Sequence, residues 1–193
     1  MSIPTSFYSP EELSNLGLKS VGIDVRLSRK ASVYSPQTIS LGDHVRIDDF
    51  CILSGLLEIG SYIHIGAYSG LFGSEGIVME DFSGLSSHVS IYTVSEDYLG
   101  ACLTNPTVPN EYRTAARKGA VRLCKHVIVG AGSVILPGVT IGTGTAVGAL
   151  ALVLGSLRPW KIATGSPARP RQDRRREEIE RLEGLMRARG LVK

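Results

Sequence analysis

Cysteines, aromatic residues and long apolar runs are scarce in this sequence. Its 193 residues include only three cysteines, Cys51, Cys102 and Cys124, and no CxxC pair. This argues against a disulfide framework and against a structural zinc site, and it suits a reducing cytoplasm. The N-terminus lacks a basic start followed by an apolar run, and no apolar stretch approaches the length that a bilayer requires. We therefore expect a soluble protein.

Strong charge is also missing from most of the chain. The net charge is +3, and the segment 169–176 alone carries five arginines against one acid. The rest is near neutral, so a nucleic-acid role has weak support. With 43% hydrophobic but only 6% aromatic residues, the chain has enough core for one domain built from small aliphatics.

Aliphatic residues recur every six positions over most of the chain. Counting from Leu41 gives one series: Leu41, Ile47, Leu53, Ile59, Ile65, Leu71, Ile77, a polar exception at Ser83, and Val89. An N-terminal series precedes it and another follows a gap: Val21, Leu27, Val33 and Ile39, then Leu123, Val129, Ile135, Ile141, Val147 and Val153. A helix needs a period near 3.6 and a strand a period of 2, so six fits neither alone. The period predicts a β-solenoid.

A second inward row and a set of corner glycines complete the repeat. The apolar residues at 45, 51, 57 and 63 lie two positions before the next repeat aliphatic, so in a strand they point the same way. Gly42, Gly60 and Gly66 each follow a repeat aliphatic, where we expect corners that need backbone freedom.

The single domain divides into three parts. Residues 1–20 form a cap whose helix begins after Ser9, with Pro10 and Glu12 in the first turn, and ends at Gly17. Residues 21–158 form the solenoid. In the tail, 159–193, residues 172–190 suggest a helix with an apolar stripe of four side chains: Ile179, Leu182, Leu185 and Met186.

The repeat stops between residues 95 and 122. This stretch has prolines, charges, two tyrosines and no period. It is longer than ordinary structureless connections, which favours a functional loop or one that a neighbouring subunit orders.

Several motifs carry a family resemblance. The segments VIVGAGSVILPGVTIGTGTAVGALALV and IATGSPAR resemble the C-terminal coils of the hexapeptide-repeat acyltransferases. FYSPEELSNLGLKSVG, VRIDDFCILSG and FSGLSSHVSIYTVSEDY resemble the branch that acylates nucleotide-linked 4-amino-4,6-dideoxy sugars, of the viosamine and anthrose type. The resemblance implies a left-handed parallel β-helix with three hexads per coil, and a homotrimer with active sites between subunits. It also implies a place in lipopolysaccharide O-antigen biosynthesis.

The co-substrate that the resemblance implies is acetyl-CoA or another short acyl-CoA. Its pantetheine arm would lie along small residues of the C-terminal coils: Gly130, Ala131, Gly132, Gly148 and Ala149. Its nucleotide would meet Lys161, Arg169 and Arg171, which can pair with phosphates. The plainer alternative is that the glycines are corners and the arginines a solvated end.

The segment entering the long loop departs from the wider family. Sugar O-acetyltransferases of this fold have a catalytic histidine there, whereas this chain has Ser95, Glu96 and Asp97. A hydroxyl needs a base to become nucleophilic, while an amine needs only to be neutral. The segment therefore favours an amine acceptor, with Asp97 as proton acceptor and Glu96 as second choice. Alternatively, both carboxylates simply begin a solvated loop.

The histidines divide into one candidate and three without a role. Strand alternation points His88 outward, where it would contact the sugar, a phosphate or a neighbouring subunit, or be an exposed structural residue. His44, His64 and His126 do not have the spacing of three converging zinc ligands, so we expect no metal.

Five further residues are candidates for substrate binding. Asp48 and Asp49 lie side by side, so that one faces outward from the coil and could hold the sugar, although aspartates often only stabilise turns. In the loop, Tyr98, Asn105 and Tyr112 could hydrogen-bond the sugar or stack on a thymine or uracil base, or merely pack the loop.

Together these features predict a cytoplasmic CoA-dependent N-acyltransferase, probably acetylating, whose acceptor is a dTDP- or UDP-linked amino sugar. The amine would attack the thioester directly, because no cysteine lies beside a plausible base. Two alternatives stay open: an O-acetyltransferase of galactoside or xenobiotic type, and a non-catalytic β-solenoid scaffold.

Overall fold

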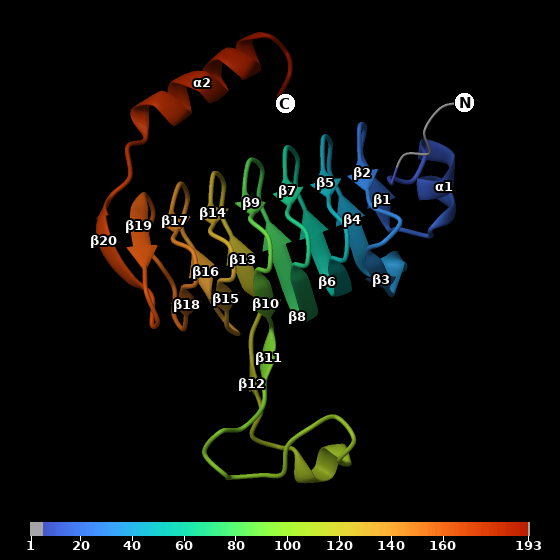
Figure 1. Cartoon of the computed structure of the whole chain (residues 1–193), viewed down its shortest axis with the longest axis vertical. Coiled ribbons are helices and arrows are strands. Elements are labelled where there is room, and N and C mark those ends of the chain that lie inside the picture. The colour runs from blue at the N-terminus through green and yellow to red at the C-terminus, as the bar shows by residue number, and fades with distance from the viewer. Residues whose placement is uncertain (1–5, 193) are drawn as a thin grey trace.

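The computed structural model describes residues 6–192 and shows a β-solenoid of about seven turns (Figure 1). The strands of one parallel sheet cover two sides of the solenoid: β1 (Ser20–Val21), β3 (Ser32–Tyr34), β4 (Ile39–Leu41), β6 (Ile52–Ile59), β8 (Gly70–Met79), β10 (Ser90–Tyr92), β13 (Val121–Leu123), β15 (Val134–Ile135), β16 (Thr140–Ile141) and β18 (Leu152–Val153). The strands of the second sheet are β2 (Arg26–Leu27), β5 (Arg46–Ile47), β7 (His64–Ile65), β9 (Gly84–Leu85), β14 (Ile128–Val129), β17 (Ala146–Val147), β19 (Lys161–Thr164) and β20 (Arg169–Asp173). The predicted fold class, an all-β solenoid of the left-handed parallel β-helix type, is confirmed.

The repeat aliphatics stack in register inside the coils. Leu53 pairs with Leu71, and Ile135 with Val153, both 18 residues apart as three hexads per coil require. Leu71 pairs with Ile91, however, 20 residues further on. The residues predicted two positions ahead of the repeat aliphatics are also buried: Val45, Cys51, Leu57 and Ile63. Each coil therefore contributes two inward side chains per hexad.

A two-residue insertion corrects the predicted count in sixes. Gly55 pairs with Gly73 but Leu57 pairs with Ile77, so β8 carries two extra residues at the corner between them. Beyond this corner the stacked residues are Met79, Leu85 and Ile91, rather than the predicted Ile77, Ser83 and Val89. The polar exception at Ser83 is thus no break in the repeat. Ser83 occupies the buried position two residues before Leu85.

The corner glycines have a different purpose from the predicted one. Gly42, Gly60 and Gly66 do not have positive φ angles. A Cβ atom on Gly42 would lie 2.7 Å from the carbonyl carbon of Gly60 in the next coil, so these glycines permit close stacking. The left-handed corners lie three residues after a stacked aliphatic, and side-chain-bearing residues such as His44 (φ 55°) and Tyr68 (φ 63°) occupy several of them.

Replacing Gly42 by alanine should therefore destabilise the protein through overpacking. We expect a loss of about 1–3 kcal/mol, or several degrees in Tm. The matched control is Gly155→Ala, because no atom lies within 4 Å of a Cβ at Gly155 and its φ is not positive. Thermal unfolding of both variants checks this, and equal Tm values for the two would contradict the stacking explanation.

Both predicted helices are present, and the second differs from its prediction. α1 (Pro10–Asn15) begins with the capping box of Ser9 and Glu12. α2 (Glu177–Ala188) is shorter than predicted, because residues 169–173 pair antiparallel with β19 as strand β20. The predicted apolar stripe is only partly right. Ile179 and Met186 are half-buried, whereas Leu182 and Leu185 are each 48% exposed.

The interrupted repeat forms an arm that projects from one corner (Figure 1). Its base is an antiparallel pair of β11 (Val94–Ser95) and β12 (Arg117–Lys118), and two short 3-10 helices occur in the chain, η1 (Pro36–Thr38) and η2 (Asn110–Tyr112), the second within the arm. No residue from 94 to 120 is buried. The arm therefore has no core of its own.

A carboxylate of α2 ties this helix to the solenoid. Glu183 lies 2.5 Å from Lys125 Nζ, 2.8 Å from His126 Nε2 and 2.7 Å from Arg187. Burial alone would raise the pKa of Glu183, but the hydrogen bonds from Lys125, Arg187 and His126 outweigh it and lower the pKa from 4.5 to about 2.

Because this pKa is depressed in the folded state, the stabilisation is present above about pH 4.5 and is lost as the pH falls towards 2. At pH 7 we expect Glu183→Gln to lower stability by about 1–2 kcal/mol, a few degrees in Tm. The difference from wild type should shrink between pH 4.5 and pH 2 in thermal unfolding experiments. A difference independent of pH would show that the carboxylate charge is not what holds the helix.

Candidate active site

A cavity of about 450 Å³ opens on the second sheet where a side chain is missing. The outward row of this sheet runs from Arg46 through His64 and Gly84 to Ile128. A Cβ on Gly84 would meet only the carbonyl oxygen of His64, at 3.5 Å, so its absence leaves a hollow between His64 and Ile128. The adjoining residues Ser86 and Ser87 also line the cavity.

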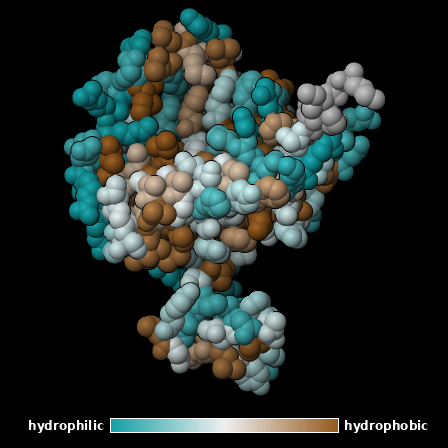
Figure 2. All heavy atoms as spheres, in the orientation of Figure 1, coloured by the Kyte–Doolittle hydropathy of each residue, from teal (hydrophilic) through white to brown (hydrophobic). Residues whose placement is uncertain are grey.

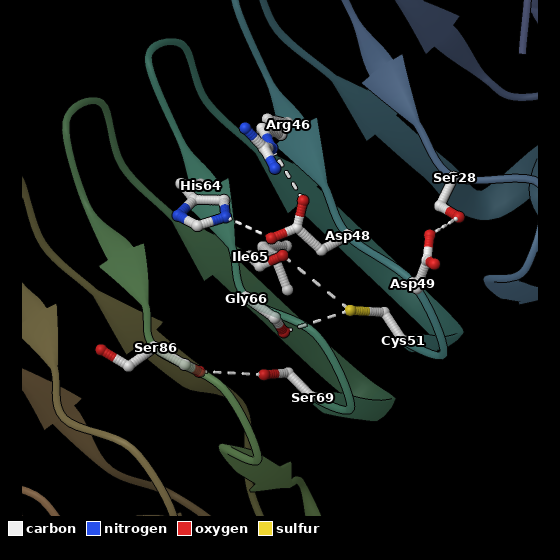
Figure 3. Close-up of polar contacts among 10 residues, drawn as sticks. All are labelled: Ser28, Arg46, Asp48, Asp49, Cys51, His64, Ile65, Gly66, Ser69 and Ser86. Atoms are coloured by element: carbon white, nitrogen blue, oxygen red, sulfur yellow. Dashed lines mark hydrogen bonds and ion pairs between the residues drawn. The ribbon is translucent and has the colours of Figure 1, made fainter. Parts of the chain in front are cut away.

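Asp48 lies in the wall of this cavity and has two partners (Figure 3). Its carboxylate lies 2.7 Å from Arg46 Nε and 2.7 Å from His64 Nε2. Burial would raise the pKa of Asp48, but the hydrogen bonds from His64 and Arg46 hold it below its usual value. The cavity thus presents an ionised carboxylate with an imidazole and a guanidinium beside it.

Asp49 has a different place from Asp48. It lies at the following corner, where it accepts hydrogen bonds from Lys30 Nζ at 2.8 Å and Ser28 Oγ at 2.5 Å. The bond from Lys30 is the main cause of its lowered pKa, with Ser28 second. Asp49 does not line the cavity, so of the two predicted aspartates only Asp48 is in the site.

His88 follows Ser87 at the same corner of the solenoid. Its ring stacks on Tyr68, with centroids 4.8 Å apart and planes inclined by 3°, and Tyr68 stacks in turn on Phe50 at 5.0 Å. The side chain is exposed, as we expected. The reason is a left-handed corner, with φ 60°, rather than strand alternation.

The predicted proton acceptor Asp97 begins the arm. Its carboxylate accepts hydrogen bonds from the backbone N–H groups of Leu99 at 2.8 Å, Ala101 at 2.5 Å and Cys102 at 3.1 Å. The bond from Leu99 is the largest cause of its lowered pKa. Asp97 is therefore ionised at neutral pH and held in one orientation.

Glu96 bonds across the arm instead. Its carboxylate lies 2.5 Å from an Nη of Arg113, and both side chains are largely buried. This pair joins the two limbs of the arm. The second-choice base is thus engaged in the internal structure of the arm.

A second cavity, of about 590 Å³, lies where the arm meets the first sheet. Tyr92, Val134, Leu136 and Leu152 form its apolar wall, and Tyr98 closes it from the arm. The other two arm candidates lie outside it. Asn105 accepts from the backbone N–H and the hydroxyl of Thr107 within a turn, and Tyr112 is 55% exposed.

The residues predicted to bind CoA come together on neighbouring coils. Gly130, Ala131 and Gly132 follow β14, and Gly148 and Ala149 follow β17, which pairs with it. A Cβ on Gly130 would lie 2.4 Å from the nitrogen of Ala149, so coil stacking alone accounts for this glycine. The alanines are exposed.

The cations predicted for the nucleotide of CoA lie on the next two strands. Lys161 begins β19 and forms an ion pair with Asp173 of β20. Arg169 and Arg171 are exposed on β20, where Arg171 Nε is 3.4 Å from the hydroxyl of Thr164. All three lie at the C-terminal end of the solenoid, beyond the small residues.

The thiols differ in exposure. Cys51 is fully buried and donates to the carbonyl oxygen of Gly66 at 3.3 Å, and burial raises its pKa. Burial also raises the pKa of Cys124. Cys102, in the arm, accepts from the backbone N–H of Ala115 at 3.4 Å. Among residues 6–192 no group of three or more His, Cys, Asp or Glu side chains could hold a metal, and no helix is long and apolar enough to cross a membrane.

Comparison with known proteins places the chain. No family model matches it. It is 42% identical over 172 residues to the dTDP-4-amino-4,6-dideoxy-D-glucose acyltransferase of Escherichia coli, an alignment that covers 88% of this chain and 89% of the relative. The chain belongs to this acyltransferase family. Membership confirms the predicted family and enzyme class, a CoA-dependent N-acyltransferase of nucleotide-linked amino sugars.

Solved structures agree with this family. AntD, an N-acyltransferase from Bacillus cereus in complex with dTDP and 3-hydroxybutyryl-CoA, is 48% identical, with a TM-score of 0.93, and the match covers 97% of this chain and 100% of that one. A maltose O-acetyltransferase from Clostridium difficile is 20% identical, with a TM-score of 0.57 over 86% of this chain and 75% of that one, and shares the fold alone.

Sequence reasoning did not select Ser86, Ser87 or His64 for the site. Serines are common in solenoid turns, and His64 was considered only as a metal ligand. A usable signal was Gly84, because it places a glycine in an outward row whose neighbouring coils carry His64 and Ile128.

Proposed function

We propose that this acyltransferase moves a short acyl group from acyl-CoA to the 4-amino group of dTDP-4-amino-4,6-dideoxyglucose. The observation that carries the proposal is the near end-to-end match to AntD, solved with that sugar nucleotide and CoA at 48% identity over 95% of this chain. We also propose that it works in the cytoplasm, where its three unpaired thiols suit the reducing conditions, and that its product serves O-antigen biosynthesis.

A spacing in the relative supports roles for two residues. AntD structures include variants of an aspartate and of a serine that lie ten positions apart. Ser87 and Asp97 have the same spacing here. Ser87 lines the cavity on the second sheet, and Asp97 begins the arm. We assign Asp97 as the proton acceptor, and Ser87 as a contact to the sugar.

The active enzyme in this proposal is a homotrimer with sites between subunits. Between Ser87 and Asp97 the chain runs through β10 and β11, and extended chain rises about 3.3 Å per residue, so the two side chains lie far apart in one protomer. Tyr98 is 89% and Leu99 95% exposed on an arm without a core. A neighbouring protomer would cover these side chains and bring an arm to the cavity.

The mechanism follows from the charge states. A neutral amine attacks the thioester carbonyl, and the nitrogen becomes positively charged as the new C–N bond forms. Asp97, held ionised by three backbone donors, accepts the proton, and the C–S bond breaks to release CoA. We place the pantetheine along the corner of Ala131 and Ala149, with Lys161, Arg169 and Arg171 near its nucleotide.

A substrate screen tests this function. dTDP- and UDP-linked amino sugars are incubated with acetyl-CoA and with 3-hydroxybutyryl-CoA, and the released thiol is measured. We expect the highest kcat/KM with dTDP-4-amino-4,6-dideoxyglucose. The matched control is the dTDP sugar with a hydroxyl at the same carbon, which should not be acylated. Comparable rates for the two would contradict an amine-specific enzyme.

A further inference from the structure

Two side chains that can carry positive charge share one carboxylate in the wall of the cavity on the second sheet. Arg46 and His64 approach Asp48 from neighbouring strands β5 and β7 (Figure 3). Asp48 is only 19% exposed, whereas Arg46 is 53% and His64 54% exposed. With His64 protonated, the cluster has a net positive charge.

Both cationic side chains have donors to spare. Arg46 uses Nε for Asp48, and among residues 6–192 its two terminal Nη groups form no hydrogen bond; its guanidinium also lies 5.7 Å from the ring centroid of Phe7. His64 uses Nε2, which leaves Nδ1 free within the same described residues. Asp48 therefore fixes the orientation of both groups without occupying them.

The cavity beside them suits a phosphate group. Of the side chains that line it, His64 is the one that can carry a positive charge. Gly66, Ala67 and Gly84 keep its floor low, and Ser86 and Ser87 present hydroxyls. Bound phosphates need charged donors and close approach to the backbone, and this arrangement offers both.

We propose that the Arg46–Asp48–His64 cluster binds the diphosphate of the sugar nucleotide, with Arg46 and His64 contacting phosphate oxygens and Asp48 positioning them. The inference rests on the proposed function, because a dTDP-linked acceptor must place its diphosphate close to the sugar that Ser87 contacts. His64 thereby gains a role that its sequence spacing did not suggest.

The test is titration calorimetry with dTDP alone. We expect His64→Gln and Arg46→Gln each to raise the Kd for dTDP about tenfold, as loss of one charged phosphate contact does. The Kd for acetyl-CoA should not change. In turnover assays both variants should raise KM for the sugar nucleotide while kcat stays within about threefold of wild type.

The chain offers a matched control in His44→Gln. His44 Nδ1 lies 3.1 Å from Asp24 Oδ2 on a neighbouring coil, so it forms the same kind of pair outside this cavity. Its loss should leave dTDP affinity unchanged. Wild-type dTDP affinity in both Arg46→Gln and His64→Gln, or an equal loss in His44→Gln, would overturn the proposal. Failure of the proposed function would appear differently, as no turnover of dTDP-linked amino sugars by the wild-type protein.

Discussion

Asp97→Asn should lower kcat at least about 100-fold while changing the Kd for acetyl-CoA less than threefold. A positioned general base contributes about 10²–10⁴ to a rate, and an amide cannot accept the proton. Asparagine keeps one oxygen that can accept from the backbone N–H groups of the arm, so the loss should be mainly chemical. Stopped assays at saturating substrates, with calorimetry of acetyl-CoA binding, separate the two effects.

The lowered pKa of Asp97 adds a pH test. Backbone donors, first among them Leu99, keep the carboxylate ionised below its ordinary pKa of 3.8. The acid limb of kcat/KM near neutral pH should then report loss of the proton from the amino sugar, and its midpoint should be the same in wild type and Asp97→Asn. The control is Glu96→Gln, whose partner is Arg113. A larger fall in kcat for Glu96→Gln than for Asp97→Asn, or equal losses in kcat and CoA affinity, would refute the assignment of Asp97.

Replacing residues 97–116 by a short glycine-serine turn should abolish acyl transfer, a fall of more than about 1,000-fold. This change removes Asp97 and the whole covering arm, and loss of a catalytic base together with its site exceeds the usual effect of the base alone. The solenoid should fold as before, because no residue from 94 to 120 is buried. Turnover and thermal unfolding measure the two outcomes.

Oligomeric state distinguishes the two roles of the arm. Light scattering of the shortened protein should show a weakened trimer if Tyr98 and Leu99 pack on a neighbour, as their exposure of 89% and 95% in one protomer suggests. Full activity in the shortened protein would contradict any role for the arm in the site. A large fall in Tm would show instead that the arm stabilises the solenoid itself.

The surface patterning explains why an exposed arm is unusual in this molecule. Figure 2 shows apolar side chains on the arm as well as on the solenoid body. The inward aliphatics of each coil are covered by the coils on either side, whereas the apolar residues of the arm have no such cover. The arm is the part of the chain that most needs a second molecule.

Local features of the fold were predictable from residues close together in sequence. The six-residue period specified the solenoid, because each hexad repeats the same pattern of strand and corner. The capping box of Ser9 and Glu12 specified α1 through contacts three residues apart. The segment of Ser95, Glu96 and Asp97 pointed to amine chemistry by its lack of histidine.

The register of the coils was not predictable in this way. The two extra residues between Gly73 and Ile77 move every later stacked position by two, so that Leu85 rather than Ser83 points into the core. A period counts along the chain, whereas stacking is a contact between residues 18 or 20 apart. Only the packed coils decide which corner absorbs an insertion.

The sequence by itself therefore determined the solenoid, its terminal helices, the projecting arm and the family. The tertiary structure decided which side chains share a cavity. Asp48 and His64 are 16 residues apart, and Gly84 and Ile128 are separated by the whole arm, yet all four line one hollow. The physical reason is that outward side chains become neighbours across hydrogen-bonded strands, and that pairing depends on the length of every corner between them.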